Sequence, residues 1–589
     1  MCSSDLLRLN ARAMDFRKWL FGSAAWGEAK LTKLAGGNSP SAPQVLGRPV
    51  PTPERLPLGG RWQLESYSVG AGLAGGALSS APSETTVDLP GSLAAALAAA
   101  GELPPLDTDD GLRAAAAMAE REWWLRRQVD IPAAWAGRRL RLRLVGASVS
   151  ADIWCNGTSV GRSGGAPEGC DEFDLSACAH PGQANELAIR LTAGPAEWSG
   201  VTWWSPPGRD KVLAPRVAWG DDGGGTCLPL GIHGELTLEA AGSVALGAPR
   251  VSAWLPDTVP AGAEATARGL VSVSLPVTLP DQEPRRVPLR AWVQGPAGPP
   301  VELVRQVQVD PQQGSLASFG FELPDARPWW PAGMGGQTCY RLTVAVDGDQ
   351  QADDVRETTF AFRQVDLRGE QLLVNGQPLQ PRVVRWRPVD RFLRPSRQRT
   401  ELLLRCALDA GFNTLRLESG ATWASRELLD RCDALGLLVL AELPLSGNIG
   451  SLSDDTAAAA AAGWADLLRN HACRLGYVLG GDVADSGDAL LRLTAAGARL
   501  AELDPDGVML RPTTAGDEAW SWSTLTDPRR GLSMKVRHLA LSTAPPASPS
   551  ALSAALADPA SVDLWPQSDV WRRRGGSDDD VRAALTRLG

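Results

Sequence analysis

Three acidic residues could do chemistry together because of where they fall in the sequence. Glu418, Glu442 and Asp482 each end, or closely follow, a short apolar segment that is predicted to be a β-strand. If these strands run parallel in one sheet, their carboxyl ends meet on one side, so the three carboxyl groups would gather there. Of two facing carboxyl groups, one can transfer a proton and the other can attack carbon as a nucleophile. The alternative, which we favour for Glu418 and Glu442, is that they have no catalytic role. They would then be polar side chains at the rim of the sheet that hydrogen-bond to Arg416 or to solvent.

Histidine and cysteine are not arranged in a way that predicts a metal site. The histidines are four in number and far apart in the sequence: His180, His233, His471 and His538. The nine cysteines are odd in number and lack Cys-x-x-Cys spacing, so we interpret them as buried or free thiols rather than zinc ligands or a disulfide framework. We therefore predict no metal and no cofactor.

The elements that must position the acidic residues lie beyond about residue 366, where the hydrophobic period alternates between that of a strand and that of a helix. The expected helices are 396–410, 425–435 and 454–469, with one more before the last strand, and the expected strands are 413–417, 437–442, 475–479 and 508–511. Such alternation predicts a parallel sheet, and the number of units favours a (β/α)8-type (TIM) barrel over residues 366–589. Some units are expected to be reduced, because about 250 residues are typical of this fold.

Two regions ahead of the barrel alternate apolar and polar residues as strands do. The first, residues 56–240, has expected strands at 123–131, 139–144, 151–154, 185–191 and 234–239, which predict an antiparallel sandwich. The second, residues 241–365, has expected strands at 271–275, 301–304 and 340–346, which predict another sandwich. Asn156-Gly157 predicts a tight hairpin turn, an interpretation that we prefer to an N-glycosylation site.

Composition excludes several classes of partner. The 589 residues carry 58 basic and 67 acidic side chains, a net charge of −9 that argues against a nucleic-acid partner in a soluble globular chain. We see no apolar run of about 18 residues and no signal pattern, so we predict no membrane span and a cytoplasmic location by default. Residues 1–55 are expected to be a leader and flexible linker. The segment Met1–Leu6 resembles a translated sequencing adapter, so we expect the natural N-terminus to differ.

Short motifs in a shared order carry a family resemblance. In the first region they are Asp88-Leu-Pro-Gly-Ser92, Glu122-Trp-Trp124, Trp154-x-Asn-Gly157, Asn185-x-Leu187 and Leu230-Gly-Ile232. In the second region and its exit they are Trp329-Trp-Pro-Ala-Gly-Met-Gly-Gly-Gln-Thr-Cys-Tyr340, Phe362-Arg363 and Leu373-Val-Asn-Gly-Gln-Pro378. In the barrel they are Arg385-Trp-Arg-Pro-Val-Asp390, Gly411-Phe-Asn-Thr-Leu-Arg416, Cys432-Asp-Ala-Leu-Gly436, Arg469-Asn-His471, Gly516-Asp-Glu-Ala-Trp520 and Leu564-Trp-Pro-x-x-x-x-Trp571. Together they resemble glycoside hydrolase family 2, in its β-mannosidase-like branch.

The resemblance implies a galactose-binding-like, jelly-roll-like β-sandwich, an immunoglobulin-like β-sandwich and a barrel, together with retaining hydrolysis of a β-glycoside. That reaction needs an acid/base and a nucleophile, two carboxyl groups about 5 Å apart. Aligned without gaps from Asn470-His471, the acid/base position falls on Asp482, where the family carries Glu; a shift of one residue places Val483 there instead. The nucleophile position falls on Leu541 or Ser542, and no Asp or Glu lies between Asp527 and Asp558. The resemblance thus implies the scaffold of a glycosidase without its nucleophile.

The same resemblance implies which residues would contact a sugar. Aromatic faces stack on pyranose rings, and charged or amide groups orient their hydroxyls. The candidates are Trp386, Trp423 and Trp520 as pocket walls, Arg416, Asn470 and His471 as pocket floor, Glu442 at the rim, and Asp221 in a loop of the first sandwich. The alternative for Arg416, Asn470 and His471 is that they hold the barrel together, and most tryptophans of the sandwiches are expected to be core residues.

Three hypotheses follow from these residues. The first is a degenerate family 2 relative, a pseudoenzyme that retains binding of a β-linked glycan. The second is an active exo-β-glycosidase of carbohydrate metabolism whose carboxylates have moved, with Asp482 facing Glu442 or Glu418. The third is that the sequence was misassembled between residues 470 and 545. A purely structural or partner-binding scaffold also stays open, as does the oligomeric state.

Overall fold

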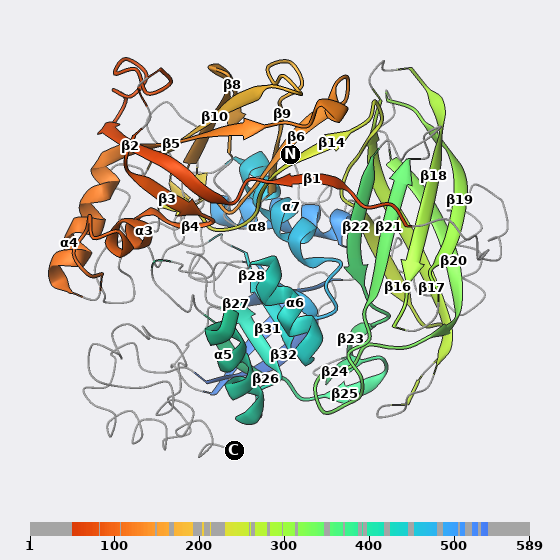
Figure 1. Ribbon diagram of the computed structural model, residues 1–589. Helices are drawn as coiled ribbons and strands as arrows, with labels where there is room; N and C mark the ends of the chain where they lie inside the picture. The colour runs from red at the N-terminus through yellow and green to blue at the C-terminus, as the bar shows by residue number, and fades with distance from the viewer. Residues whose placement is uncertain are drawn as a thin grey trace.

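A computed structural model describes residues 50–539 apart from a set of short gaps. The gaps are 80, 82, 107, 148–149, 164–169, 193–202, 205–211, 214–229, 258, 261–265, 280–282, 297–298, 312–315, 347–353, 369–370, 387–391, 393–396, 418–424, 444, 446–452, 480–486, 505–506, 513–520 and 528–531. Within the described ranges no helix is long and apolar enough to cross a membrane. Figure 1 shows three parts: a sandwich at the upper left, a second sandwich at the right and a barrel below them.

The first part is a sandwich of two antiparallel sheets. Its six-stranded sheet has the order β3-β2-β5-β10-β7-β8, with strands Thr86–Leu89, Gly60–Ser68, Arg121–Asp130, Ala184–Thr192, Ser150–Cys155 and Thr158–Arg162. Its four-stranded sheet has the order β1-β14-β6-β9, with strands Glu54–Pro57, Leu236–Ala241, Arg139–Val145 and Cys170–Asp174. Two short strand pairs, β4 with β13 and β11 with β12, are Gly91–Ser92, Gly231–Ile232, Trp203–Trp204 and Val212–Leu213. Helices α3 (Leu93–Ala99) and α4 (Asp109–Ala117) lie at one end (Figure 1).

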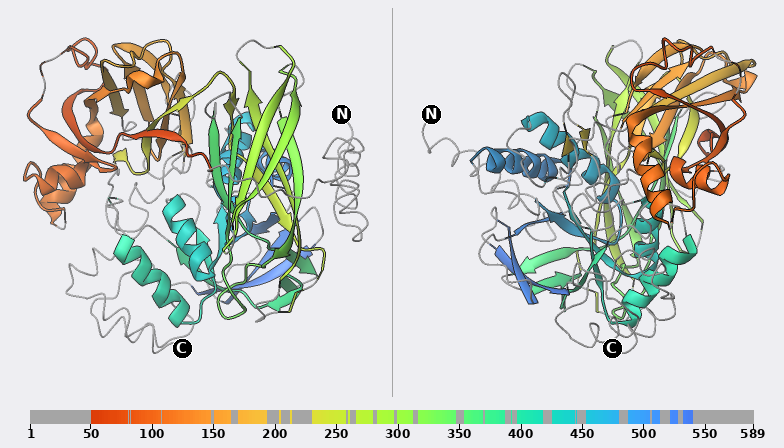
Figure 2. Two further views of the ribbon diagram at one scale, coloured as in Figure 1. Left: turned by 45° about the vertical axis from the view of Figure 1, so that its right-hand side comes forward. Right: turned by 90° about the vertical axis from the view of Figure 1, so that its left-hand side faces the viewer.

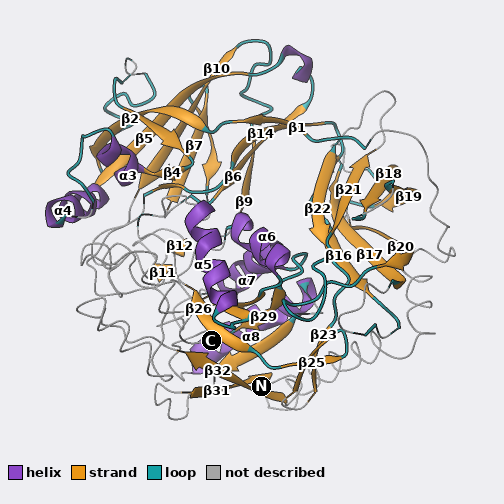
Figure 3. Cartoon of the chain, turned by 60° about the horizontal axis from the view of Figure 1, so that its bottom comes forward, coloured by secondary structure: helices purple, strands orange, loops and turns teal. Residues whose placement is uncertain are grey.

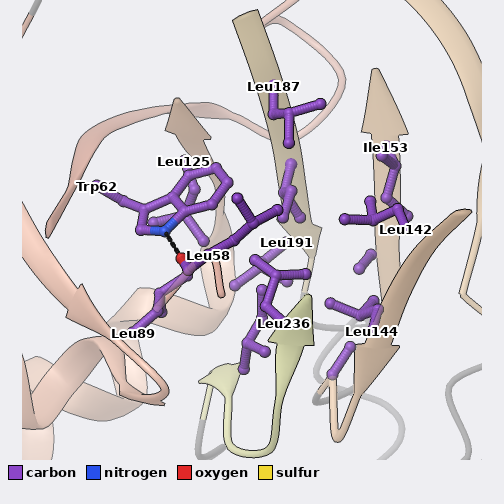
Figure 4. Close-up of a cluster of buried hydrophobic side chains, with 14 of the residues drawn as sticks. Leu58, Trp62, Leu89, Leu125, Leu142, Leu144, Ile153, Leu187, Leu191 and Leu236 are labelled. Atoms are coloured by element: carbon purple, nitrogen blue, oxygen red, sulfur yellow. Dashed lines mark hydrogen bonds between the residues drawn. The ribbon is translucent and has the colours of Figure 1, made fainter. Parts of the chain in front are cut away.

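Alternate residues of the facing strands fill the core of this sandwich. Leu125, Ile153 and Leu187 of one sheet and Leu142 and Leu236 of the other are all buried in one cluster (Figure 4). This is the pattern expected when two pleated sheets pack face to face. The predicted hairpin turn is confirmed, because Asn156 and Gly157 connect β7 to β8 at positive φ values of 48° and 77°.

The second part is also a pair of antiparallel sheets around its own core. One sheet joins β15, β17, β16 and β20, which are Ala245–Leu246, Ala267–Thr278, Arg250–Trp254 and Leu316–Ala326. The other has the order β19-β18-β21-β22, with strands Val301–Val309, Arg285–Gln294, Tyr340–Val346 and Val355–Phe360. The left view of Figure 2 shows the long strands of this part beside the barrel helices. A small sheet, β23 (Val365–Arg368), β24 (Gln371–Val374) and β25 (Gln377–Leu379), leads from it into the barrel.

The third part is a closed barrel in the order β26 to β32. Its strands are Arg382–Trp386, Thr414–Leu417, Leu438–Glu442, Arg474–Val478, Val508–Pro512, Ser521–Asp527 and Leu532–Leu539. Its helices are α5 (Arg397–Asp409), α6 (Arg426–Leu435), α7 (Asp454–Leu468) and α8 (Gly487–Leu503). In Figure 3, α5, α6 and α7 lie above β29 in the view, α8 lies below it, and β31 and β32 lie at the lower edge of the barrel.

The barrel follows the expected alternation only in part. Strands β26 to β30 are parallel neighbours, as the sequence predicts for β27 to β30, whereas β26 was not among the expected strands. β31 is antiparallel to both β30 and β32, and β32 closes the barrel by parallel pairing with β26. Seven strands are therefore described where a complete eightfold repeat has eight, and the last turn of the barrel is a hairpin rather than a strand-helix unit.

Local sequence explains where the helix α6 begins and ends. The hydroxyl oxygen of Ser425 accepts a hydrogen bond from the amide of Leu428 at 3.1 Å, which satisfies one of the free donors of the first turn. Gly436 ends the helix with a φ of 76°, a left-handed conformation that favours glycine. Because β28 follows at once, this cap sets the start of the strand that carries Glu442.

Candidate functional site

Arg416 and Glu442 form an ion pair at the carboxyl end of the barrel. Arg416 is the third residue of β27 and Glu442 is the last residue of the neighbouring strand β28. The Nε and Nη2 atoms of Arg416 donate to Oε2 of Glu442 at 3.0 and 2.9 Å. The Glu442 side chain is 3% exposed and that of Arg416 is 13% exposed. The structure thus brings these two candidates together, in the manner that our rim-group interpretation expects.

Trp386 lies at the same end of the barrel, as the last residue of β26. Its side chain is only 3% exposed and belongs to the main apolar cluster of the barrel, which also contains Leu415, Leu417 and Tyr477. A sugar-stacking platform needs an open ring face, and the indole of Trp386 has little of it exposed. The sandwich tryptophans predicted to be core residues are confirmed as such for Trp124, Trp154 and Trp329, which are all buried.

Asn470 lies at the opposite end of the barrel, ahead of the first residue of β29. Its Oδ1 accepts a hydrogen bond from the amide of Val251 at 3.0 Å, and its Nδ2 donates to the carbonyl oxygen of Pro249 at 2.8 Å and to Oγ1 of Thr358 at 2.9 Å. All three partners belong to the second sandwich or the segment that enters it. The amide of Asn470 therefore fixes the barrel to that sandwich, away from the end that carries Glu442.

His471 belongs to a buried polar group at this same amino-terminal end. Its Nδ1 lies 2.7 Å from Oδ2 of Asp433, and Oδ1 of Asp433 accepts from the amide of Cys473 at 2.7 Å. The ligand-type atoms of Asp433, His471 and Cys473 lie within 4.8 Å of one another, so these are the described residues that could hold a metal. Burial, together with the nearby carboxylate of Asp433, raises the pKa of the Cys473 thiol well above its usual value. The arrangement is that of a hydrogen-bonded network rather than of a thiolate site.

A second buried network ties β29 to β30 at the same end. Arg474, the first residue of β29, donates from Nη1 to both carboxylate oxygens of Asp504 at 2.8 and 2.7 Å. The hydroxyl of Tyr477 donates to Oδ2 of Asp504 at 2.7 Å. The side chains of Arg474 and Asp504 are 7% and 5% exposed. Sequence reasoning missed Asp504, although its position between a helix and a strand was a signal of a barrel-end residue.

The remaining candidates lie outside the described residues. They are Asp221, Trp423, Asp482, Trp520, Leu541 and Ser542, together with Glu418. Of the acidic residues that the sequence placed at strand ends, only Glu442 is therefore located. Asp433, which was named only as part of the motif Cys432-Asp-Ala-Leu-Gly436, is the partner of His471.

The fold and the first sandwich define the class of protein to which the chain is related. Residues 74–233 match the family described as glycosyl hydrolase 2 galactose-binding domain-like. This stretch covers β3 to β13 of the first sandwich. The chain is thus a relative of the family 2 glycoside hydrolases, which confirms the resemblance seen in the sequence.

Curated proteins similar to this chain include exo-β-D-glucosaminidases and β-mannosidases. An exo-β-D-glucosaminidase of Streptomyces avermitilis is 28% identical over 391 residues, which are 62% of this chain and 40% of that protein. An exo-β-D-glucosaminidase of Amycolatopsis orientalis is 26% identical over 54% of this chain and 28% of its own length. A β-mannosidase of Mus musculus is 32% identical over 19% of this chain and 14% of its own length. The matched part of the chain spans less than half the length of these relatives.

Solved structures share the fold at low identity. The exo-chitosanase of Amycolatopsis orientalis superposes with a TM-score of 0.61 at 21% identity, over 78% of this chain and 54% of that chain. A β-D-mannosidase of Dictyoglomus thermophilum has a TM-score of 0.63 at 17% identity, over 77% of this chain and 57% of that chain. Two further structures of the exo-chitosanase, one with a Glu replaced by Ala and one with an Asp replaced by Ala, are complexes with PNP-β-D-glucosamine.

Proposed function

We propose that this protein binds a β-linked glycan or glycoside without hydrolysing it, as a family 2 pseudoenzyme. One observation carries the proposal: between Asp527 and Asp558, where the resemblance places the nucleophile, the sequence contains no carboxylate. Neither Leu541 nor Ser542 can form the glycosyl ester of a retaining mechanism. A serine hydroxyl would need an adjacent base to act in its place.

Within this proposal the chain is arranged as 1–55 leader, 56–240 first sandwich, 241–365 second sandwich and 366–589 barrel. The barrel is a shortened variant of the (β/α)8 fold. Its carboxyl end holds the ligand, with Arg416 near the floor, Glu442 at the rim and Asp482 at the former acid/base position. Trp423, Trp520 and Asp221 are the remaining candidates for this pocket, whereas the buried Trp386 supports the wall behind them.

The relatives refine the ligand class. Those with the longest matches are exo-β-D-glucosaminidases, so we place β-D-glucosaminides beside β-mannosides as ligands to test. The exo-chitosanase complexes also support binding without turnover, because variants that lost an Asp or a Glu still hold PNP-β-D-glucosamine in that protein.

The alternative is an active exo-β-glycosidase in which Glu442 replaces the nucleophile. The contact with Arg416 and an exposed fraction of 3% weigh against it, because a nucleophile must reach the anomeric carbon. If the alternative held, Glu442→Gln would abolish turnover. A scaffold that binds only another protein would show neither turnover nor glycoside binding.

Calorimetric titration and turnover assays on the same preparation test the proposal. The ligands are PNP-β-D-glucosaminide, PNP-β-mannoside and chitosan oligosaccharides, and the variants are Asp482→Ala and Glu442→Gln. We expect binding of at least one ligand and no release of nitrophenol above the rate in buffer. Turnover that Glu442→Gln abolishes would establish the displaced-carboxylate enzyme, and absence of all binding would leave the scaffold hypothesis. Resequencing the region 470–545 from the source tests whether the segment that should carry the nucleophile was misassembled.

A further inference from the structure

Two cysteines of the first sandwich meet in its core. Cys155 is the last residue of β7 and is fully buried, and Cys178 follows β9 and is 7% exposed. Both belong to the same cluster of core side chains, and their thiol groups lie within hydrogen-bonding reach of each other. The seven cysteines in the described part of the chain are all in the thiol form.

Hydrogen bonds on either side fix the two backbones against each other. Nδ2 of Asn156 donates to the carbonyl oxygen of Cys178 at 2.8 Å and to Oδ1 of Asn185 at 2.9 Å. Oδ1 of Asn185 also accepts from the amide of His180 at 2.7 Å. One asparagine pair therefore holds the chain directly after Cys155 against the backbone around Cys178.

We propose that Cys155 and Cys178 form an intramolecular disulfide when the chain folds in the presence of a small-molecule disulfide such as oxidised glutathione. One cysteine thiolate attacks a sulfur of the oxidant, which forms a mixed disulfide and releases one thiol. The second cysteine thiolate then attacks the mixed disulfide, which forms the protein disulfide and releases the second thiol. The protein loses two electrons and two protons, and the oxidant gains them.

Burial decides when this bond can form. It raises the pKa of the Cys155 thiol to about 12, and the hydrogen bond with Cys178 adds to the effect. At neutral pH only about one thiol in 10⁵ is then the reactive thiolate, whereas the unfolded thiol has a pKa of about 8.5. The folded dithiol is thus slow to oxidise, and the disulfide is acquired before the core closes. It would join the end of β7 to the segment between β9 and β10.

Oxidative refolding of the full chain tests the proposal. The chain is unfolded under reducing conditions and refolded with a mixture of reduced and oxidised glutathione, and free thiols are then alkylated and the peptides mapped by mass spectrometry. We expect a linked pair of peptides that contains Cys155 and Cys178 and that separates on reduction. We also expect a rise of about 5 °C in the melting temperature over the reduced form. Native protein given the same oxidant should keep both thiols alkylatable after denaturation.

Matched variants separate this bond from general oxidation. Cys155→Ala and Cys178→Ala should lose the linked peptide and the redox-dependent rise in melting temperature, whereas Cys406→Ala, at a buried cysteine of α5, should keep both. The same peptide map on chain exported to the bacterial periplasm gives an answer that does not depend on refolding yield. Free Cys155 and Cys178 in folded protein from both preparations, or a link to a different cysteine, would overturn the proposal.

Discussion

The two ends of the barrel are built in opposite ways. At the amino-terminal end, buried polar groups pair closely: His471 with Asp433 at 2.7 Å, and Arg474 with Asp504 at 2.7 Å. At the carboxyl end, the described strands carry the single ion pair of Arg416 with Glu442. The segment that should bring a nucleophile to this end contains no carboxylate.

The difference separates what holds the scaffold from what performs chemistry. Paired charges at the amino-terminal end connect strands to helices and to the second sandwich, so the barrel needs them whether or not it turns over a substrate. Groups at the carboxyl end serve catalysis in barrel enzymes and can change without loss of the fold. A protein that keeps the first set and lacks part of the second is what we expect of a pseudoenzyme.

The largest effect should come from restoring a carboxylate at the carboxyl end. Leu541→Glu and Ser542→Glu cover the two registers of the nucleophile position, and we expect one of them to hydrolyse an aryl β-glycoside that the parent does not. If Asp482 then serves as general acid, Asp482→Ala in that variant should lower the new rate by about a hundredfold or more. Release of nitrophenol measures both rates.

Ser542→Gln and Leu541→Gln are the matched controls, because they add the same bulk without a charge. Absence of turnover in both Glu variants, with glycoside binding intact, would mean that more than the nucleophile separates this site from an active one. The carboxyl end of the barrel would then differ from an active site by more than one missing carboxylate.

The next largest effect should fall at the amino-terminal end. Asp504→Ala removes the carboxylate that accepts from Arg474 and from the Tyr477 hydroxyl, and so takes this counter-charge away from a buried guanidinium. A loss of about 3–5 kcal/mol in the free energy of unfolding is expected, measured by urea denaturation. Glu502→Ala, whose side chain is 68% exposed, should stay within about 0.5 kcal/mol of the parent. Equal losses in the two variants would contradict the assignment of Asp504 as a structural partner.

A smaller loss is expected at the carboxyl end. Glu442→Leu leaves Arg416 without this partner, but Arg416 is 13% exposed and reaches some solvent, so the expected cost is about 2–3 kcal/mol. The double variant Arg416→Met with Glu442→Leu should recover most of that loss, because apolar groups of similar size can replace a buried pair. If the double variant is less stable than Glu442→Leu alone, Arg416 has a structural role of its own.

Asn470→Ala should lower the free energy of unfolding by a smaller amount again, by weakening the contact between the barrel and the second sandwich. It removes three hydrogen bonds to the second sandwich, and an expected cost of about 1–2 kcal/mol reflects the groups left unsatisfied in a partly buried contact. Amide hydrogen exchange should rise at Val251 and its neighbours. Glycoside binding should not change, since the contact lies at the other end of the barrel. A loss of binding would instead support the pocket-floor role that the sequence suggested.

Many strands and helices of the scaffold could be predicted from the sequence, because local residue patterns determine where they begin and end. The strands expected at 413–417 and 437–442 are β27 and β28 to within one residue at each end. Helix α6 matches for a similar reason, since Ser425 and Gly436 mark its limits. The antiparallel strand β31 was not predicted, because pairing partners far along the chain determine strand direction.

The candidate site was harder to predict because contacts between distant residues decide side-chain roles. Asn470 was assigned to a pocket floor on a motif, but its partners Pro249 and Thr358 lie more than 100 positions away in the sequence. The pairing of Arg416 with Glu442 could be anticipated, since both lie near the carboxyl ends of neighbouring parallel strands. The assignment of Asp482, Leu541 and Ser542 to the catalytic positions came from the family resemblance, and it stays a prediction.

The smallest expected effect concerns the contact between the two sandwiches, where Glu239 of β14 pairs with Arg356 of β22. Buried opposite charges pair there, as they do at the amino-terminal end of the barrel. Glu239 is buried there, which disfavours its charge, but Arg143, Arg356 and Arg141 outweigh burial and lower the pKa of its carboxyl group. A lowered pKa gives stability that is present above the ordinary value of 4.5 and is lost as the pH falls through the folded value. The urea midpoint of the parent should therefore fall more steeply between about pH 5 and pH 3 than that of Glu239→Gln. Glu502→Gln should follow the parent, and an identical slope in Glu239→Gln would show that this carboxylate does not stabilise the contact between the two sandwiches.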